Sequence, residues 1–175
     1  MNAYVSIDSP IGRLLLHTDG ASLTGLYMDV PGRPPSGMKD WVQNADAGPL
    51  PEAVLQLKEY FAGSRRGFDI PLRLKGTEFQ QRVWNALTEI PYGATLSYGE
   101  LATRIGNPKA SRAVGLANGR NPISILVPCH RVIGADGSLT GYGGGLARKQ
   151  WLLAHEGLHL GCVQQAVGGR LAKSA

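Results

Sequence analysis

The second half of the chain carries three helix-start signals within about thirty residues, and these constrain its fold more than any other feature. Thr77-Glu78-Phe79-Gln80 and Ser97-Tyr98-Gly99-Glu100 both match the capping box, in which two side chains satisfy the first free N–H groups of a helix. Asn107 and Pro108 supply an N-cap and a first position for a third helix, expected over 109–118. Two helices separated by a Gly-Asn turn, the second of them basic, predict a helix-turn-helix.

The expected third helix combines small residues with basic ones. The small residues are Ala110, Ser111, Ala113 and Gly115, and the basic residues are Lys109 and Arg112. Small side chains let a helix backbone approach a partner closely, although tight helix packing would explain them as well. The two cations favour nucleic acid as the partner.

The distribution of charge supports the same partner. Residues 1–76 are electrically neutral, so the whole net charge of +5 lies in the C-terminal part. Residues 97–131 hold five bases against the single acid Glu100. Such a patch favours a polyanion, and the alternative is a solvated basic face that improves solubility.

The first half of the chain is expected to form a small α+β unit without a chemical motif. Three short β-prone segments, 3–8, 13–18 and 23–29, are separated by turn residues and predict a meander. Apolar residues at helical spacing predict a helix over 50–61, and alternation over 68–74 predicts a further strand.

The segment with the clearest chemical character is Pro128-Cys129-His130-Arg131-Val132, which follows an apolar run at 123–127. A thiol is a strong nucleophile only as thiolate, and at a pKa of about 8.5 only a few per cent is ionised near neutrality. His130 could accept the proton, directly or through a water, while Arg131 would add positive potential. A strand before Pro128 would hold the sulfur at the end of a rigid element. A lone Cys after a strand is more often a small buried hydrophobe, so this segment alone leaves both interpretations open.

A glycine-rich loop, 141–145, surrounds Tyr142 and precedes a closing helix expected from Leu146 to about Glu156. The loop lacks the Lys-Ser or Lys-Thr of a phosphate-binding loop. The composition of the loop fits better with a flexible segment that lines a pocket and lets a flat ring lie beside Tyr142.

The segment His155-Glu156-Gly157-Leu158-His159 matches the zinc motif H-E-x-x-H. Gly157 falls at the expected helix end, and a third ligand is missing beyond the distant Cys162 or His17. We therefore expect Glu156 to orient a histidine instead of serving a metal.

The chain has 175 residues, enough for one large domain or two small ones, and two cysteines, which make no disulfide framework. The N-terminus has no signal-peptide pattern, and no apolar run approaches membrane-spanning length. These features predict a reduced, cytoplasmic protein.

Four of these segments together resemble the O6-alkylguanine-DNA alkyltransferases, the methylated-DNA:protein-cysteine methyltransferases. They are Pro-Cys-His-Arg-Val at 128–132, Asn118-Gly119-Arg120-Asn121-Pro122, the helix start at 97–102 and the glycine loop around Tyr142. The resemblance covers about residues 77–157. It implies an α+β fold, with a ribonuclease-H-like α/β domain over 1–76 and a winged helix-turn-helix domain over 77–160, and we expect a mobile tail over 161–175.

The resemblance also implies an activity. This is DNA repair by irreversible, single-turnover transfer of an alkyl group from O6 of guanine in duplex DNA, with O4 of thymine as a further candidate. Cys129 would be the acceptor, His130 would draw its proton through a water, and Glu156 would hold His130. Tyr98 would help rotate the 3′ phosphate and would hydrogen-bond or protonate the departing guanine, and Asn121 would brace the adjacent turn.

The remaining implied roles concern DNA and the base. Arg112 would fill the gap left by an extruded base, with the helix docked in the minor groove. The other DNA-contacting residues would be Lys109, Ala110, Ser111, Ala113, Gly115 and Arg120. The pocket for guanine would be lined by Tyr98, Asn118, Arg131, Val132, Tyr142 and Gly143, with the Val132 backbone reading the guanine amino group.

The chemistry needs neither a metal nor an organic cofactor, and the partner implied is duplex DNA bound by a monomer that could act cooperatively. Some family members hold a structural zinc in the N-terminal domain, but His17 stands there without a cysteine, so no such zinc is expected. Two other classes stay open: a DNA-binding regulator with Cys129 as a redox sensor, and a cysteine hydrolase. A dimerisation helix is missing for the regulator, and adjacent residues such as Cys129 and His130 rarely aim at each other as a hydrolase requires.

Overall fold

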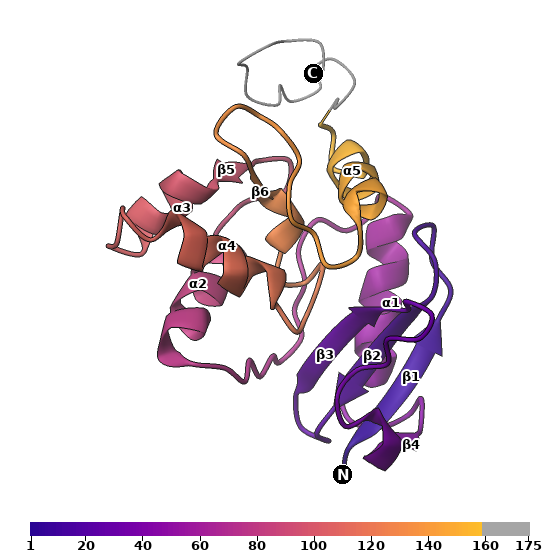
Figure 1. Cartoon of the computed structure of the whole chain (residues 1–175). Helices are drawn as coiled ribbons and strands as arrows, with labels where there is room; N and C mark the ends of the chain where they lie inside the picture. The colour runs from indigo at the N-terminus through magenta and orange to yellow at the C-terminus, as the bar shows by residue number, and fades with distance from the viewer. Residues whose placement is uncertain (159–175) are drawn as a thin grey trace. The chain divides into compact units, whose positions relative to one another are not determined.

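The computed structural model describes residues 1–158, which fall into two compact units (Figure 1). One unit comprises residues 1–75 and 122–126, and the other comprises the remaining residues from 76 onward. The tail expected after Gly161 lies outside the described residues. Residues 122–126 belong to the first unit, although the sequence places them in the second. The reason is hydrogen bonding, because the Leu26 N–H donates to the Pro122 carbonyl at 2.9 Å and the Ser124 N–H donates to the Leu26 carbonyl at 3.2 Å.

The N-terminal unit is built on a four-stranded sheet in the order β3-β2-β1-β4. The strands are β1 Ala3–Ile7, β2 Leu14–Thr18, β3 Leu23–Met28 and β4 Val42–Gln43. The first three pair antiparallel in chain order, as the predicted meander requires, and β4 lies parallel to β1.

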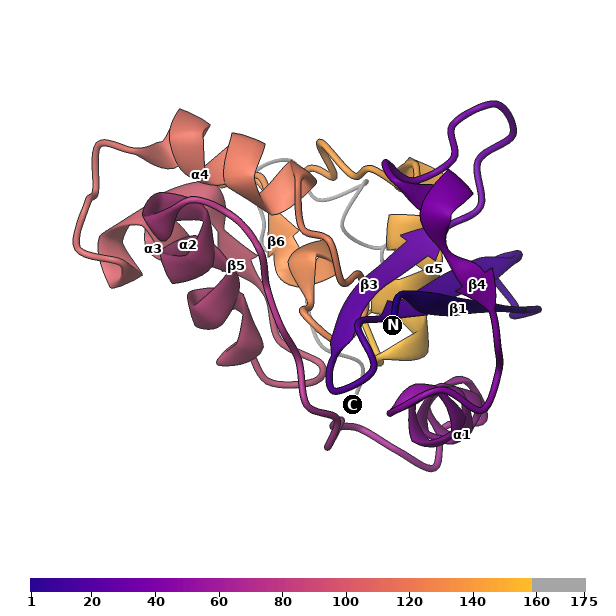
Figure 2. The same ribbon diagram turned by 90° about the horizontal axis from the view of Figure 1, so that it is seen from below.

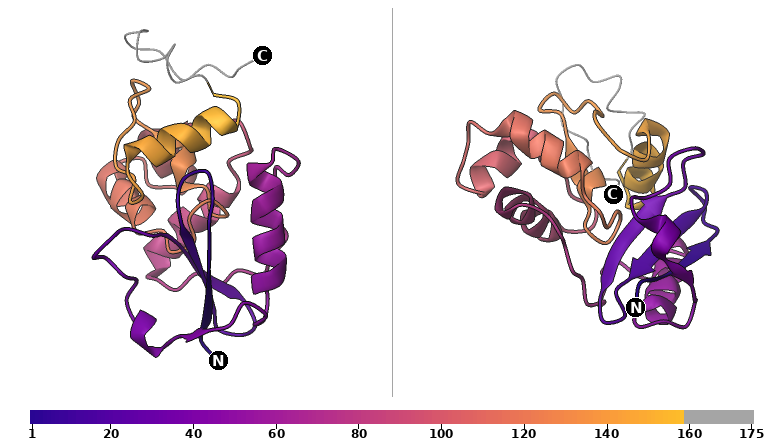
Figure 3. Two further views of the ribbon diagram at one scale, coloured as in Figure 1. Left: turned by 90° about the vertical axis from the view of Figure 1, so that its right-hand side faces the viewer. Right: turned by 60° about the horizontal axis from the view of Figure 1, so that its bottom comes forward.

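Helix α1, Leu50–Phe61, lies along one face of this sheet (Figure 3). Its buried residues include Leu50, Ala53, Leu57 and Tyr60, which recur every three or four positions and so share one stripe. Pro51 stands in the first turn, where a missing N–H breaks no helical hydrogen bond. The helix therefore forms over the range predicted.

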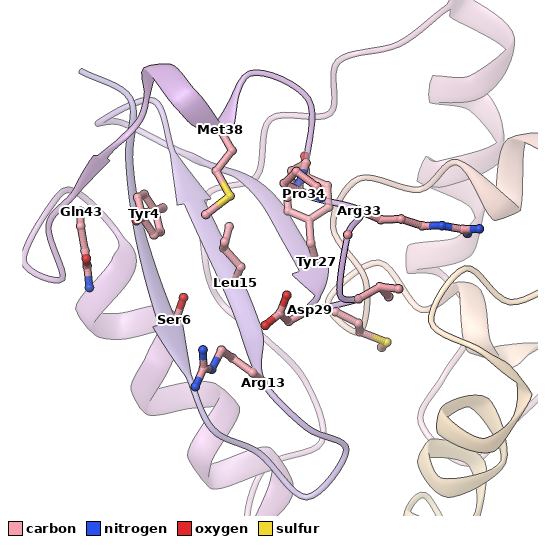
Figure 4. Close-up of a pocket in the computed structure, with 14 residues that line it drawn as sticks. Tyr4, Ser6, Arg13, Leu15, Tyr27, Asp29, Arg33, Pro34, Met38 and Gln43 are labelled. Carbon is pink, nitrogen blue, oxygen red and sulfur yellow. The ribbon is translucent and has the colours of Figure 1, made fainter.

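The face of the sheet turned away from α1 carries a cavity of about 440 Å³ (Figure 4). Tyr4, Leu15 and Tyr27 project into it from three neighbouring strands, and Met38 and Pro34 close it from the segment that joins β3 to β4. Met38 begins a short 3₁₀ helix, Met38–Asp40.

The strand predicted over 68–74 does not form. The segment makes only an isolated bridge between Leu72 and Leu23, in which the Leu23 N–H donates to the Pro71 carbonyl at 2.8 Å. Pro71 has no N–H to give, so the ladder cannot continue through it.

The C-terminal unit contains three mutually packed helices, α2 Glu78–Thr88, α3 Tyr98–Arg104 and α4 Ser111–Gly119 (Figure 2). Both predicted capping boxes are formed, at Thr77 with Gln80 and at Ser97 with Glu100. The Trp84 indole N–H donates to the Ala117 carbonyl at 2.8 Å and so ties α2 to α4.

Helix α4 begins later than predicted. The Ala110 N–H donates to the Asn107 carbonyl at 3.0 Å, which closes a turn with Pro108 at its second position. Lys109 and Ala110 therefore lie in this turn, and the first helical residue is Ser111.

A two-stranded parallel sheet and a last helix complete the unit. Strands β5 Leu96–Ser97 and β6 Val132–Ile133 pair side by side, and α5 spans Leu146–His155. The predicted α+β class is confirmed. Across residues 1–158, none of the helices has the length and apolar character that a bilayer crossing needs.

Candidate active site

Cys129 lies at the start of a 3₁₀ helix, Cys129–Arg131, and its side chain is 5% exposed. The strand expected before Pro128 is absent. Ser124 to Leu126 form a turn instead, in which Ile125 has a φ of 73°. A β-branched residue in this left-handed region is strained, so its surroundings must hold it there.

Two asparagines hold the cysteine segment: Asn118 in the last turn of α4, and Asn121 directly after the C-cap of that helix. The Asn121 amide donates to the Val127 carbonyl at 2.7 Å, and the Asn118 amide donates to the Cys129 carbonyl at 3.3 Å. The Cys129 N–H in turn donates to Val127 at 2.8 Å. The Asn121 contact is the geometry that a bracing role requires, and Asn118, which is 1% exposed, holds the cysteine backbone in the same way.

His130, which follows Cys129 in the chain, forms a buried pair with Glu156. His130 Nε2 lies 2.9 Å from Glu156 Oε2, and both side chains are fully buried. Burial lowers the pKa of His130 below its ordinary value, despite the opposing effect of Glu156, so the ring is neutral near pH 7. Burial by itself raises the pKa of Glu156, but His130 and Arg131 outweigh it and hold that pKa well below its usual range.

These contacts determine which nitrogen of the His130 ring carries the proton. A neutral His130 facing a carboxylate carries its proton on Nε2 and donates it to Glu156, which leaves Nδ1 as an acceptor. His130 Nδ1 is buried and has no hydrogen-bond partner among residues 1–158. The ring is thus held with a free base on the side away from Glu156, as proton removal from a thiol requires.

Arg131 does not act as the sequence suggests. Its Nε lies 2.7 Å from Glu156 Oε1 and one terminal nitrogen lies 3.0 Å from Oε2, while the other donates to the Ile90 carbonyl at 2.6 Å. The carboxylate neutralises the guanidinium, so Arg131 supplies little positive potential to Cys129. Its contacts make it a clamp between Glu156 and the end of α2.

Lys149 is a buried cation that the sequence analysis missed. Its ammonium donates to the Val132 carbonyl at 2.5 Å and to the Thr140 carbonyl at 2.9 Å, and it lies 5.9 Å from the Tyr98 ring centroid. It is 0% exposed and forms no ion pair with any described residue. Burial lowers its pKa to about 8, and the nearby Cys129 partly opposes this shift.

A signal for Lys149 does exist in the sequence. Lys149, Leu152 and Leu153 stand at positions i, i+3 and i+4 of α5, and all three are buried. A lysine on the apolar stripe of a helix indicates a buried charge.

Tyr98, the first residue of α3, lies between α4 and the loop at 140–145. Its hydroxyl donates to the Thr140 carbonyl at 3.0 Å, and burial raises its pKa. Gly115 and Gly141 border the ring, because a Cβ built on either would stand 3.7 Å from a Tyr98 atom, at ordinary van der Waals distance. Tyr98 and Lys149 therefore share the Thr140 carbonyl.

The glycine loop reaches the end of α4. A Cβ on Gly143 would lie 3.7 Å from the Gly119 carbonyl, and the Gly145 N–H donates to the Tyr142 carbonyl at 3.0 Å to close a turn. Tyr142 is half-buried. The structure thus brings Tyr142 and Gly143 beside the helix that braces Cys129.

The side of α4 that faces away from its buried residues is exposed to solvent. Val114, Ala117 and Asn118 are buried, whereas Arg112, Ala113 and Arg120 are exposed, as is Lys109 in the preceding turn. Ser111 and Gly115 are partly exposed. The small and basic residues expected to contact DNA are therefore accessible on one side of the unit.

Two side chains of the H-E-x-x-H segment, His155 and Glu156, contact other residues of the protein. Glu156 pairs with His130 and Arg131, and the His155 ring stacks on Trp151 at 4.8 Å. His159 lies outside the described residues. Among residues 1–158, no three His, Cys, Asp or Glu side chains gather in a way that could hold a metal ion.

Family models match most of the chain. The DNA-binding domain of 6-O-methylguanine DNA methyltransferase matches residues 78–158, and the ribonuclease-like domain of the same protein matches residues 2–74. The chain therefore belongs to the 6-O-methylguanine DNA methyltransferase family.

Individual relatives agree with this assignment. A methylated-DNA–protein-cysteine methyltransferase of Mycobacterium bovis is 58% identical over 87% of this chain and 91% of the relative. One from Methanosarcina acetivorans is 55% identical over 88% of this chain and 97% of the relative. Among solved structures, the O6-methylguanine methyltransferase of Mycobacterium tuberculosis has a TM-score of 0.83 at 56% identity, covering 89% of this chain and 93% of that chain. A structure of Mycobacterium tuberculosis OGT in complex with DNA has a TM-score of 0.81 at 56% identity, covering 88% of this chain and 92% of that chain.

Proposed function

We propose that the protein repairs DNA by transferring the alkyl group of O6-alkylguanine to Cys129, irreversibly and once per molecule. The observation that carries the proposal is the buried His130-Glu156 pair next to Cys129 in the chain, in which Glu156 lies 2.9 Å from Nε2 of a neutral ring and leaves Nδ1 available as a base. Membership of the methyltransferase family supports the reaction type, and the DNA complex of the Mycobacterium tuberculosis relative supports DNA as the partner. The regulator and hydrolase alternatives have no such support.

In the reaction, His130 accepts the thiol proton of Cys129 through a water molecule. The thiolate attacks the alkyl carbon, so a carbon–sulfur bond forms while the bond between that carbon and O6 breaks. We assign Tyr98 to hydrogen-bond or protonate the guanine as it leaves. The thioether product has no leaving group that the site could expel, and the protein is consumed.

The alkylated base must leave the stack before the sulfur can reach it. Flipping costs a few kcal/mol, and we assign Arg112 to the space that the base vacates. The small residues Ser111, Ala113 and Gly115 let α4 lie deep in the minor groove. Tyr142, Gly143 and the Val132 backbone then receive the base.

The proposal includes a monomer that works in the reducing cytoplasm, because the acceptor thiol must stay reduced. Sedimentation of the protein alone and with a short duplex tests the monomer.

Mass spectrometry of the intact protein tests the reaction. After incubation with duplex DNA containing O6-methylguanine, the protein gains one methyl mass on Cys129, and transferred methyl never exceeds one equivalent. Repeated turnover, or label on Cys162, would contradict the proposal.

A further inference from the structure

Leu116 stands on the open side of α4 with 67% of its surface exposed. The helix buries Val114, Ala117 and Asn118, and Leu116 lies on the opposite stripe. A single exposed leucine is ordinary by itself. The exposed residues around Leu116 distinguish it from an ordinary exposed leucine.

Arg112, Leu116 and Arg120 follow one another at intervals of four residues, so they stand in a line that runs from the first turn of α4 to its C-cap. Both arginines are exposed, and neither guanidinium makes an ion pair or hydrogen bond with any described residue. An apolar side chain is thus framed by two unpaired cations.

The residues three positions before and after Leu116 have small side chains or none. Ala113 precedes it by three residues and Gly119 follows it by three, and a Cβ on Gly119 would meet nothing within 4 Å. Leu116 therefore projects above small neighbours into space that a partner can enter. A duplex fits this pattern, because its phosphates attract the two arginines while the sugar rings that wall its minor groove are apolar.

We propose that Leu116 is a specificity-determining residue for duplex DNA. Its side chain enters the minor groove beside Arg112 and packs on the deoxyribose rings next to the extruded nucleotide. The inference rests on the proposed function. Apolar side chains of minor-groove proteins pack on or wedge between base steps and stabilise distorted duplexes. In this protein Arg112 fills the vacated space, and Leu116, one turn further along α4, supports the sugars beside that space.

The proposal separates an apolar contribution from an electrostatic one. Binding through phosphates weakens with salt in proportion to the number of contacts, whereas burial of a leucine adds affinity that salt does not release. Leu116→Ala should therefore lower duplex affinity by roughly tenfold at every salt concentration, with the slope of log affinity against log salt unchanged.

The experiment measures three quantities for each variant. These are affinity for an undamaged duplex from 50 to about 200 mM salt, the rate of transfer from O6-methylguanine duplex, and the rate with free O6-benzylguanine. Leu116→Ala should lose affinity and duplex rate yet keep the free-base rate, and Leu116→Met should restore both because it stays apolar. Leu55→Ala is the matched control, since Leu55 is 50% exposed on α1.

Three results would overturn the inference: a Leu116→Ala variant that binds and repairs duplex like wild type, one that loses free-base reaction equally, or one with a changed salt slope. Failure of the proposed function has a different signature. In that case the wild-type protein accepts no methyl group, whatever residue stands at position 116.

Discussion

Glu156 Oε2 accepts a hydrogen bond from His130 Nε2 at 2.9 Å while the same carboxylate takes two contacts from the Arg131 guanidinium. One acid thus keeps the ring oriented and neutralises a buried cation. The chemistry of Cys129 and the stability of its surroundings therefore depend on the same residue.

Cys129→Ser should bind duplex DNA like wild type but transfer no methyl group. An alcohol is far less acidic than a thiol, so His130 cannot generate the nucleophile. Electrophoretic mobility shifts measure binding, and radiolabelled methyl measures transfer. Methyl transfer by the serine variant would show that Cys129 is not the acceptor.

Glu156→Gln should slow transfer from duplex DNA and from free O6-benzylguanine by the same factor. The substitution weakens the support of His130 and leaves DNA handling intact. It also leaves the buried Arg131 without its carboxylate, which costs about 3–5 kcal/mol of stability. Rates are compared below the melting temperature of the variant, measured by circular dichroism. A loss restricted to duplex DNA would assign Glu156 to DNA binding.

Arg112→Ala should slow repair of duplex DNA while leaving reaction with free O6-benzylguanine largely intact, because a free base pays no unstacking cost. The measurement is the ratio of the two rate constants for each variant, which cancels differences in protein quality. Equal losses on both substrates would show that Arg112 is structural or catalytic.

Lys149→Met should change how stability depends on pH. Burial lowers the pKa of Lys149 from 10.5 to about 8, so between these values the unfolded chain holds a proton that the folded protein has released. Wild type should therefore gain stability relative to Lys149→Met as pH rises from 8 to 10.5, by up to about 3 kcal/mol. Urea unfolding at a series of pH values measures the difference.

Lys58→Met provides the control for this comparison, because Lys58 is exposed on α1 and its replacement removes no buried charge. A pH-independent difference between wild type and Lys149→Met would show that burial does not lower the pKa of Lys149 in the folded protein.

Local signals determined much of the fold. The capping boxes at Thr77 and Ser97 operate within four residues, and α2 and α3 begin where these motifs place them. The helical spacing of Leu50, Val54, Leu57 and Phe61 likewise predicted α1 without reference to the rest of the chain, although the residues that the helix buries include Ala53 and Tyr60 in place of Val54 and Phe61. The Pro-Cys-His-Arg-Val segment identified the candidate nucleophile because an unusual combination of reactive side chains needs no tertiary partner to be noticed.

Only the tertiary structure decided those features that depend on contacts between residues far apart in the sequence. The segment before Pro128 is apolar enough for a strand, but its backbone pairing, which is with Leu26, stops at Ser124 and a turn follows. Arg131 lies beside Cys129 in the chain, yet Glu156, twenty-five residues later, takes its charge. Lys149 is a cation among the residues around Cys129 because α5 folds back on Val132. Helix caps are satisfied by neighbours in sequence, so they could be predicted. The partners of a buried charged group are whatever the fold packs against it, so the contacts of Arg131 and Lys149 could not be predicted.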